Sequence, residues 1–158
     1  MTSRDSDSQE QRNAERLILD GVERKVNETL APRRLALHAG ATVQVDGVSD
    51  DESVLVEVFA HQGQLKGGQR HKIAGDALKL ITLAREREPR PRLILAFAGE
   101  QLATWAGGES WLAAALAAWD IEVIVVKLDE RVRSGLRAAQ ARQVMVNPAP
   151  RKDVQPDS

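Results

Sequence analysis

The chain has 158 residues, of which 42% are hydrophobic and 28% are charged, and this length fits one compact domain with its own core. Cysteine is absent, which excludes disulfides, thiolate nucleophiles, iron–sulfur clusters and thiolate zinc sites. The formal net charge of −1 gives no global basic field, and the 3% aromatic content argues against a platform on which single-stranded bases stack.

Both ends of the chain are polar. Residues 1–10 have almost nothing to bury, and residues 147–158 carry three prolines with mixed charge, so we expect a disordered acidic tail and a disordered C-terminal tail around one domain over residues 11–146. The longest apolar stretches, residues 93–98 and 111–119, are shorter than the ~20 residues that cross a bilayer. We therefore expect a cytoplasmic protein with no membrane partner.

The first half of the chain predicts a helix followed by a hairpin. Apolar residues at helical spacing predict a helix over residues 13–30, which Pro32 ends. Alternation with period two predicts a strand over residues 42–46, and a β-branched apolar run predicts another over residues 53–60. The polar turn at residues 47–52 joins them as an antiparallel hairpin.

The second half alternates helices with short apolar strands. In chain order it predicts a helix over 69–87, a strand over 93–98, a helix over 109–119, a strand over 122–128 and a basic helix over 129–143. The whole order predicts an α/β fold, with a mixed central sheet of an antiparallel hairpin and parallel strands flanked by helices. Five aromatic residues in or beside apolar runs are expected in the core: Phe59, Phe97, Trp105, Trp111 and Trp119.

Glu57 stands within the apolar run of a predicted core strand, where an ionised carboxylate is costly unless it has a cation or donors. Folding the hairpin brings Asp46, at the end of the preceding strand, close to Glu57. Two converging carboxylates at a sheet edge suit Mg²⁺ or Mn²⁺, which keep several waters and take one or two protein carboxylates.

A dense set of donors follows this strand, on a glycine-rich loop and the start of the next helix. It comprises Lys66, Gln69, Arg70, His71 and Lys72. Free N–H groups at a helix start bind anions, so this stretch is expected to hold a phosphate beside the metal. A metal that polarises a phosphoryl oxygen, with a lysine that orients water or offsets charge, is typical of phosphodiester hydrolysis.

The element order and the Asp46 to Glu57 spacing resemble the PD-(D/E)XK, or restriction-endonuclease-like, superfamily over most of residues 13–126. The resemblance implies a nuclease that acts on DNA, with Asp46 and Glu57 as both catalytic residues and metal ligands. The family's strand lysine is replaced by Phe59. The resemblance then moves that role to Lys72 on the next helix with Gln69 one turn before it, with Lys66 and His61 as further candidates.

The family's acid on the first helix matches either Glu15 or Glu23. In this interpretation Lys66, Arg70 and His71 contact nucleic acid. Either a homodimer or a larger assembly with a partner protein is expected, and in the homodimer Trp105 or the alanine-rich helix would supply the apolar contact.

Two other interpretations stay open. The chain is then either a catalytically inactive nuclease-fold module for nucleic-acid binding or protein assembly, or an unrelated α/β interaction protein in which Glu57 is paired with Lys72 or Arg70. Asp46 followed by glycine is also a common turn start. Four arginines of the last predicted helix are candidates for contact with a phosphate backbone, or form an ordinary solvated face: Arg131, Arg133, Arg137 and Arg142.

Overall fold

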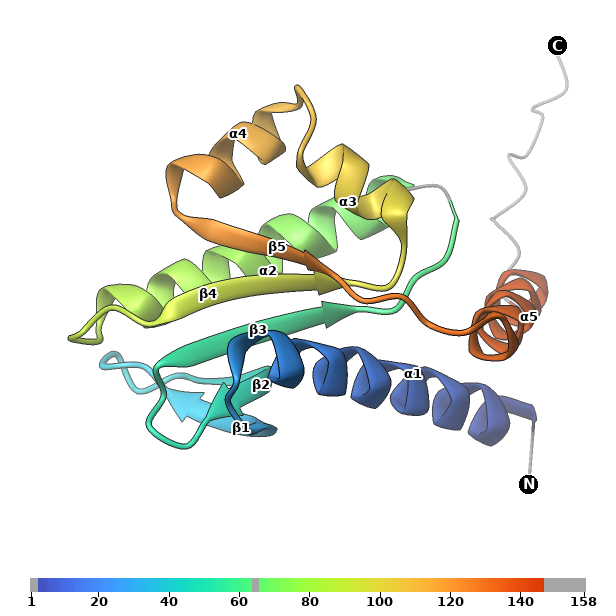
Figure 1. Cartoon of the computed structure of the whole chain (residues 1–158), viewed down its shortest axis with the longest axis horizontal. Coiled ribbons are helices and arrows are strands. Elements are labelled where there is room, and N and C mark those ends of the chain that lie inside the picture. Colours follow the sequence, from blue (N-terminus) through green and yellow to red (C-terminus); the bar gives the residue numbers. More distant parts are fainter. Residues whose placement is uncertain (1–2, 64–65, 147–158) are drawn as a thin grey trace, which may run out of the picture.

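In a computed structural model of the chain, which describes residues 3–63 and 66–146, helices cover both faces of a five-stranded sheet (Figure 1). The strands lie side by side in chain order: β1 (Leu30–Ala36), β2 (Thr42–Ser49), β3 (Val54–Phe59), β4 (Arg92–Phe97) and β5 (Ile121–Val125). Strands β1, β2 and β3 pair antiparallel, whereas β3, β4 and β5 pair parallel. The predicted α/β fold with a mixed sheet is therefore confirmed.

Two separate hydrophobic clusters hold the helices on the sheet. Helices α1 (Ser3–Val26) and α5 (Glu130–Val146) pack on one face, through Ile18 and Leu136. Helices α2 (Gly67–Arg85), α3 (Glu100–Ala106) and α4 (Trp111–Ala118) pack on the other, where Leu80 is buried. Strand β3 is buried on both sides, because side chains alternate between the two faces of a strand. None of the helices in the described part of the chain is long and apolar enough to span a membrane.

Helix α1 begins and ends earlier than the sequence predicts. It starts at Ser3, so residues 3–10 are helical in the structure and not the expected disordered tail. The side chain of Asp7 is buried and accepts hydrogen bonds from Arg142 of α5, and this long-range contact is invisible to local pattern. The helix ends at Val26, where Asn27 has a φ of 57°. The expected tail over residues 147–158 lies outside the described residues.

Strand β1 replaces the predicted end of the first helix, and Pro32 lies within it. Strand β2 also runs to Ser49, so the predicted turn at residues 47–52 begins later and Gly47 pairs with Val56. Between the pairs Ala31–Val48 and Arg33–Val45 the register shifts. Asp46 and Gly47 therefore oppose Pro32 alone in a β-bulge, which suits a proline because it has no N–H to donate.

The predicted aromatic core is only partly present. Phe59 and Phe97 are buried and stacked, with ring centroids 5.0 Å apart. Trp111 and Trp119 are 76% and 50% exposed, so the prediction that they are core residues is wrong. They stand at the two ends of the short helix α4, whose core contacts come from Leu112, Ala113 and Leu116.

Candidate active site

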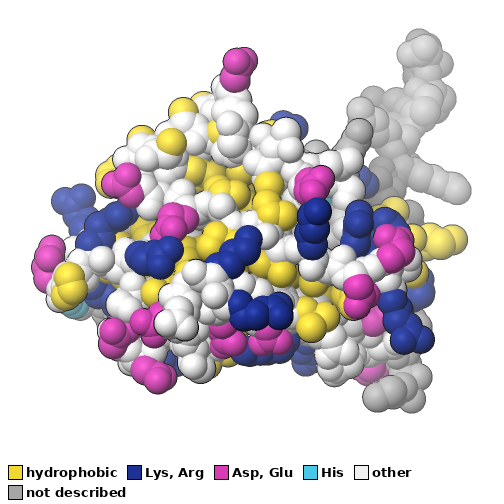
Figure 2. Space-filling view, viewed as in Figure 1, with side chains coloured by type: hydrophobic (Ala, Val, Ile, Leu, Met, Phe, Trp, Pro, Cys, Tyr) yellow, Lys and Arg dark blue, Asp and Glu magenta, His cyan; other side chains and the backbone are white. Residues whose placement is uncertain are grey.

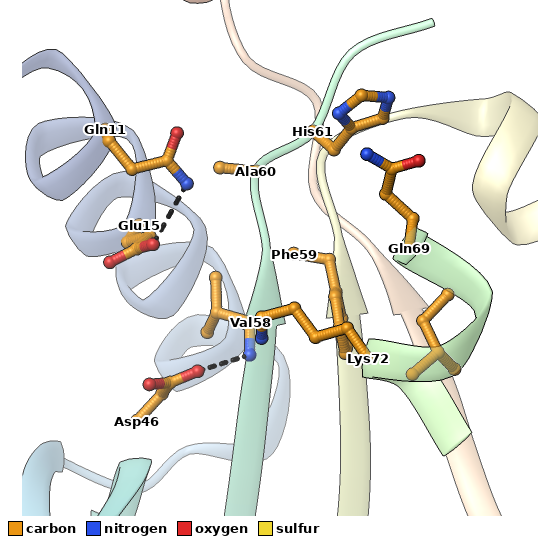
Figure 3. Close-up of a pocket in the computed structure, with 10 residues that line it drawn as sticks. Gln11, Glu15, Asp46, Val58, Phe59, Ala60, His61, Gln69 and Lys72 are labelled. Carbon is orange, nitrogen blue, oxygen red and sulfur yellow. Dashed lines mark hydrogen bonds between the residues drawn. The ribbon is translucent and has the colours of Figure 1, made fainter. Parts of the chain in front are cut away.

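The β-bulge fixes the position of Asp46. Its Oδ2 accepts a hydrogen bond of 2.9 Å from the backbone N–H of Val58 on β3, as drawn in Figure 3. Because the bulge leaves Asp46 outside the regular β1–β2 pairing, its side chain reaches across to the neighbouring strand. The predicted convergence of Asp46 on the strand that carries Glu57 thus has a specific structural basis.

Glu57 lies in the middle of β3 and is 2% exposed. Burial, which disfavours the charged form, raises its pKa to about 8, and repulsion from Asp46 adds to this increase. The Nζ atom of Lys79 lies 2.8 Å from Oε1 of Glu57 in an ion pair, which acts in the opposite direction. No described residue gives Oε1 a contact with hydrogen-bond geometry. Glu57 is therefore a buried carboxylate whose one cationic partner satisfies it incompletely.

The sequence analysis missed Lys79. This residue lies on α2 and donates a 2.8 Å hydrogen bond to the backbone carbonyl of Gln44, besides its ion pair with Glu57. Its Nζ is also 3.5 Å from Oδ1 of Asp76. The partner of Glu57 is therefore neither Lys72 nor Arg70. The spacing of Lys72, Asp76 and Lys79 places all three on one face of a helix, and this was the available signal.

Lys72 extends from α2 across the ring of Phe59 toward β3 (Figure 3). Its Nζ lies 4.8 Å from the ring centroid of Phe59 and 2.8 Å from Oδ2 of Asp76. Gln69 stands one turn earlier, and its Oε1 accepts a 2.8 Å hydrogen bond from the backbone N–H of Lys66. The amide of Gln69 thus helps to start α2 while it faces the same cavity as Lys72.

Several of the polar side chains predicted for the site line one cavity of about 130 Å³ (Figure 3). Glu15 enters it from α1, Asp46 from β2, Lys72 and Gln69 from α2, and His61 from the segment after β3. Glu57 does not line this cavity, but its carboxylate is close enough to Asp46 for mutual repulsion. Three elements and the segment after β3 thus contribute polar groups to one small space.

Glu15, and not Glu23, is the acid of α1 that faces this cavity. Burial raises the pKa of Glu15, a hydrogen bond from Gln11 opposes the increase, and repulsion from Asp46 adds to it. Glu23 instead accepts hydrogen bonds from the N–H of Leu30 and from Arg16. It has a structural partner at the start of β1.

Three of the predicted phosphate-binding residues lie outside this cavity. Arg70 and His71 are exposed on α2, and the guanidinium of Arg70 lies 5.8 Å from the ring centroid of Trp105. Lys66 precedes α2 and lines a neighbouring cavity together with His61 and Gln69. The donor-rich stretch is therefore divided between two surfaces.

Carboxylate oxygens are the ligands that Mg²⁺ and Mn²⁺ prefer, and the donor set at Asp46 and Glu57 fits such an ion chemically. Asp46 raises the pKa values of both Glu15 and Glu57, so a cation added among these groups would relieve repulsion. Within residues 3–63 and 66–146, however, no group of three or more His, Cys, Asp or Glu side chains is arranged to hold a metal ion. An ion here would complete its coordination with water or substrate oxygens.

No family model matches the chain, and searches of curated proteins and of solved structures also find no match.

Proposed function

We propose that the protein is a divalent-metal-dependent phosphodiesterase that acts on DNA, with Asp46 and Glu57 as the metal carboxylates. The observation that supports this proposal is the electrostatic strain among Asp46, Glu57 and Glu15, which burial and mutual repulsion hold at raised pKa values on Glu57 and Glu15. Asp46 repels both Glu15 and Glu57, and a cation beside Asp46 would relieve both repulsions, whereas a structural ion pair at Glu57 alone would leave the repulsion at Glu15.

Each residue at the cavity would then have a separate role. A bound Mg²⁺ or Mn²⁺ would polarise a phosphoryl oxygen of the substrate and lower the pKa of a water molecule. Lys72, which faces the cavity, would offset the charge that develops on the phosphate, and the amide of Gln69 would orient the water. The hydrogen bond from Val58 to Asp46 holds that carboxylate in place without neutralising it.

A metal titration tests the proposal. A ligand that binds only the folded protein must raise its melting temperature, by roughly 2.7 kcal/mol of stability at a hundredfold excess over its Kd. We expect Mn²⁺ and Mg²⁺ to stabilise the parent but not Asp46→Asn, in which the amide oxygen still accepts from Val58. Glu28→Gln is the matched control, because Glu28 is exposed in the turn after α1 and does not line the cavity.

Cleavage is then measured with the same three proteins. We expect the parent and Glu28→Gln to cut plasmid or single-stranded DNA in Mn²⁺, and Asp46→Asn to lose that activity. An equal metal response in all three proteins would contradict the site, since unspecific binding to surface carboxylates would then explain it.

The ion pair between Lys79 and Glu57 favours a second candidate, the inactive nuclease-fold module. An ammonium already lies 2.8 Å from Oε1 of Glu57, and Phe59 stands on β3 where the nuclease family has its strand lysine. Lys79→Met separates the two. If a metal competes with the ammonium, this variant binds Mn²⁺ more tightly than the parent does; if neither protein responds to metal, the module is favoured. Protonation of Glu57, whose pKa is about 8, makes the variant tolerable at neutral pH.

A further inference from the structure

Two larger cavities lie beside the candidate active site, where the parallel strands end. One, of about 430 Å³, lies between the end of β5, the start of α3 and α5, and its cationic lining residues are Lys127, Arg133 and Arg137. The other, of about 420 Å³, lies between α5 and the segment after β3. Ligands of α/β proteins bind at the carboxyl ends of parallel strands. We call the two cavities together the carboxyl-edge groove.

The groove adjoins the candidate active site. Its two cavities share Gln62 and Arg137 as lining residues. The second cavity also shares His61 and Gln69 with the cavity that holds Asp46. A long ligand lying in the groove would therefore reach the candidate active site without leaving the surface.

Cations and amides dominate the lining of the groove. Its cationic residues are Lys66, Lys127, Arg133 and Arg137, against one lining carboxylate, Glu100. Glu130 pairs with Arg133 and Arg137, but all three side chains are exposed, and exposed pairs are weak enough to exchange for another anion. In Figure 2, Lys and Arg side chains gather together with Asp and Glu side chains around the end of β5 and along α5.

A partly buried contact holds α5, which carries the arginines, at the groove. The backbone N–H of Gln62 donates to Oε1 of Gln140 at 2.9 Å, and the Nε2 of Gln140 donates to the carbonyl of Gln62 at 3.0 Å. Gln62 is 6% exposed, so this two-way link ties α5 to the end of β3. Arg133 and Arg137 precede Gln140 on the same helix and are held over the groove, whereas Arg142 is engaged by Asp7.

We propose that the carboxyl-edge groove binds the phosphodiester backbone of an unpaired nucleic-acid strand, with Arg133 and Arg137 contacting its phosphates. Guanidinium groups are suited to phosphate. Each cavity has the size of a small-ligand site, whereas proteins that read a duplex insert a protruding helix or ribbon into a groove about 12 Å wide. Among the described residues that line the groove there is no Phe, Tyr or Trp, so binding would depend on salt and show little base preference. The inference rests on the proposed function only for the continuation of the strand to Asp46.

Fluorescence anisotropy with a labelled 12-residue oligothymidylate, in EDTA and from 50 to 200 mM salt, tests this inference. For single strands, each phosphate contact contributes about 0.7 to the slope of log affinity against log salt. We expect Arg137→Gln to lower that slope by about 0.7 and to weaken binding by roughly three- to tenfold at 50 mM salt. Arg85→Gln removes the same charge from the last turn of α2. Only the start of α2 lines the groove, so this variant is expected to bind like the parent.

Several outcomes would overturn the inference. These are no binding by the parent at 50 mM salt, equal effects of Arg137→Gln and Arg85→Gln, equal affinity for a duplex of the same length, or equally effective competition by thymidine monophosphate. The last would mean that the groove takes a lone phosphate. The proposed function fails separately: it requires metal-dependent hydrolysis of bis(p-nitrophenyl) phosphate, which does not need the groove. If the parent binds the strand but does not hydrolyse this substrate, the inference about the groove stands and the proposed enzymatic function is refuted.

Discussion

Replacing Glu57 with glutamine is expected to change how the stability of the protein depends on pH. In the folded protein burial, assisted by repulsion from Asp46, raises the pKa of Glu57 from an ordinary 4.5 to about 8. A carboxyl group with a raised folded-state pKa binds more protons when folded than when unfolded, so stability falls as pH rises between these two values. Its contribution is fully present below pH 4.5 and is lost by pH 8.

The magnitude follows from the same two pKa values. Each pH unit within this window removes up to about 1.4 kcal/mol, which gives an upper limit of about 5 kcal/mol for the whole window. Lys79 is partly exposed, and relaxation around it brings the expected loss to roughly 2–4 kcal/mol. Glu57→Gln has no titrating group at this position, so its stability relative to the parent should rise by that amount between pH 5 and pH 8.

Urea unfolding at pH 5, 6.5 and 8 without divalent metal measures this difference. Other titrating groups are common to both proteins and cancel when the two are compared. Glu28→Gln, at an exposed position, should follow the parent at every pH. Parallel profiles for the parent and Glu57→Gln would refute the reasoning, because they would show that Lys79 keeps Glu57 charged throughout. A fall in the stability of Glu57→Gln relative to the parent between pH 5 and pH 8 would also refute the reasoning.

Two further predictions concern the packing of the helices. Gly21→Ala should destabilise the protein by about 1–3 kcal/mol, because the new Cβ would lie 2.5 Å from a methyl group of Val126. Gly75→Ala, with nothing within 4 Å, should instead stabilise it by about 0.5–1 kcal/mol through helix propensity. Equal signs in urea unfolding would contradict this contrast. Leu136→Ala on α5 should cost about 2–5 kcal/mol, since Leu136 is buried between α5 and α1. Val144→Ala, at an exposed position of the same helix, should change stability by less than about 0.5 kcal/mol, and an equally small effect of both variants would show that α5 is not docked.

The hydrophobic pattern of the sequence predicts the order of most helices and strands, because each of them buries either one face or both faces. The alternation before Asp46 and the apolar run around Glu57 mark β2 and β3, and both are strands in the structure, although β2 runs on to Ser49. Strand β1 buries only Leu30 and Leu35, and the exposed or half-buried positions between them include Pro32, so neither periodicity appears there. Helix α3, with seven residues, is too short for a helical period to be read.

The first turns of α1 show a different limit. Residues 3–10 are polar and have no apolar stripe, which locally indicates a solvated tail. In the structure the buried Asp7 meets Arg142, and Glu10 lies beside Gly135 of α5. Contacts between segments this far apart in sequence stabilise the helix, and a reading of either segment alone does not contain them.

The sequence singles out the acidic residues of the candidate site, Asp46 and Glu57, but not Lys79, the lysine that pairs with Glu57. Glu57 is conspicuous because it is a charge in an apolar run, and Asp46 follows from the hairpin. The predicted hairpin brings the two close but does not contain the bulge opposite Pro32, which depends on pairing with an unpredicted strand. Lys79 lies two turns beyond Lys72, within the amphipathic pattern of α2. In the sequence it resembles an ordinary surface lysine, and only the packing of α2 against β3 places its ammonium beside Glu57.

Stability alone does not account for the pair of Glu57 and Lys79. Exchanging a buried ion pair for apolar residues of similar size is often neutral or stabilising, and the strand around Glu57 is otherwise wholly apolar. The pair also leaves Oε1 without hydrogen-bond geometry, and Asp46 makes the charge on Glu57 more costly still. A fold selected only for packing has no need of this arrangement, whereas a site that exchanges a proton or an ammonium for a divalent cation needs a carboxylate that is buried, strained and close to a second one. The strain at Glu57 is therefore what the proposed cation site would relieve.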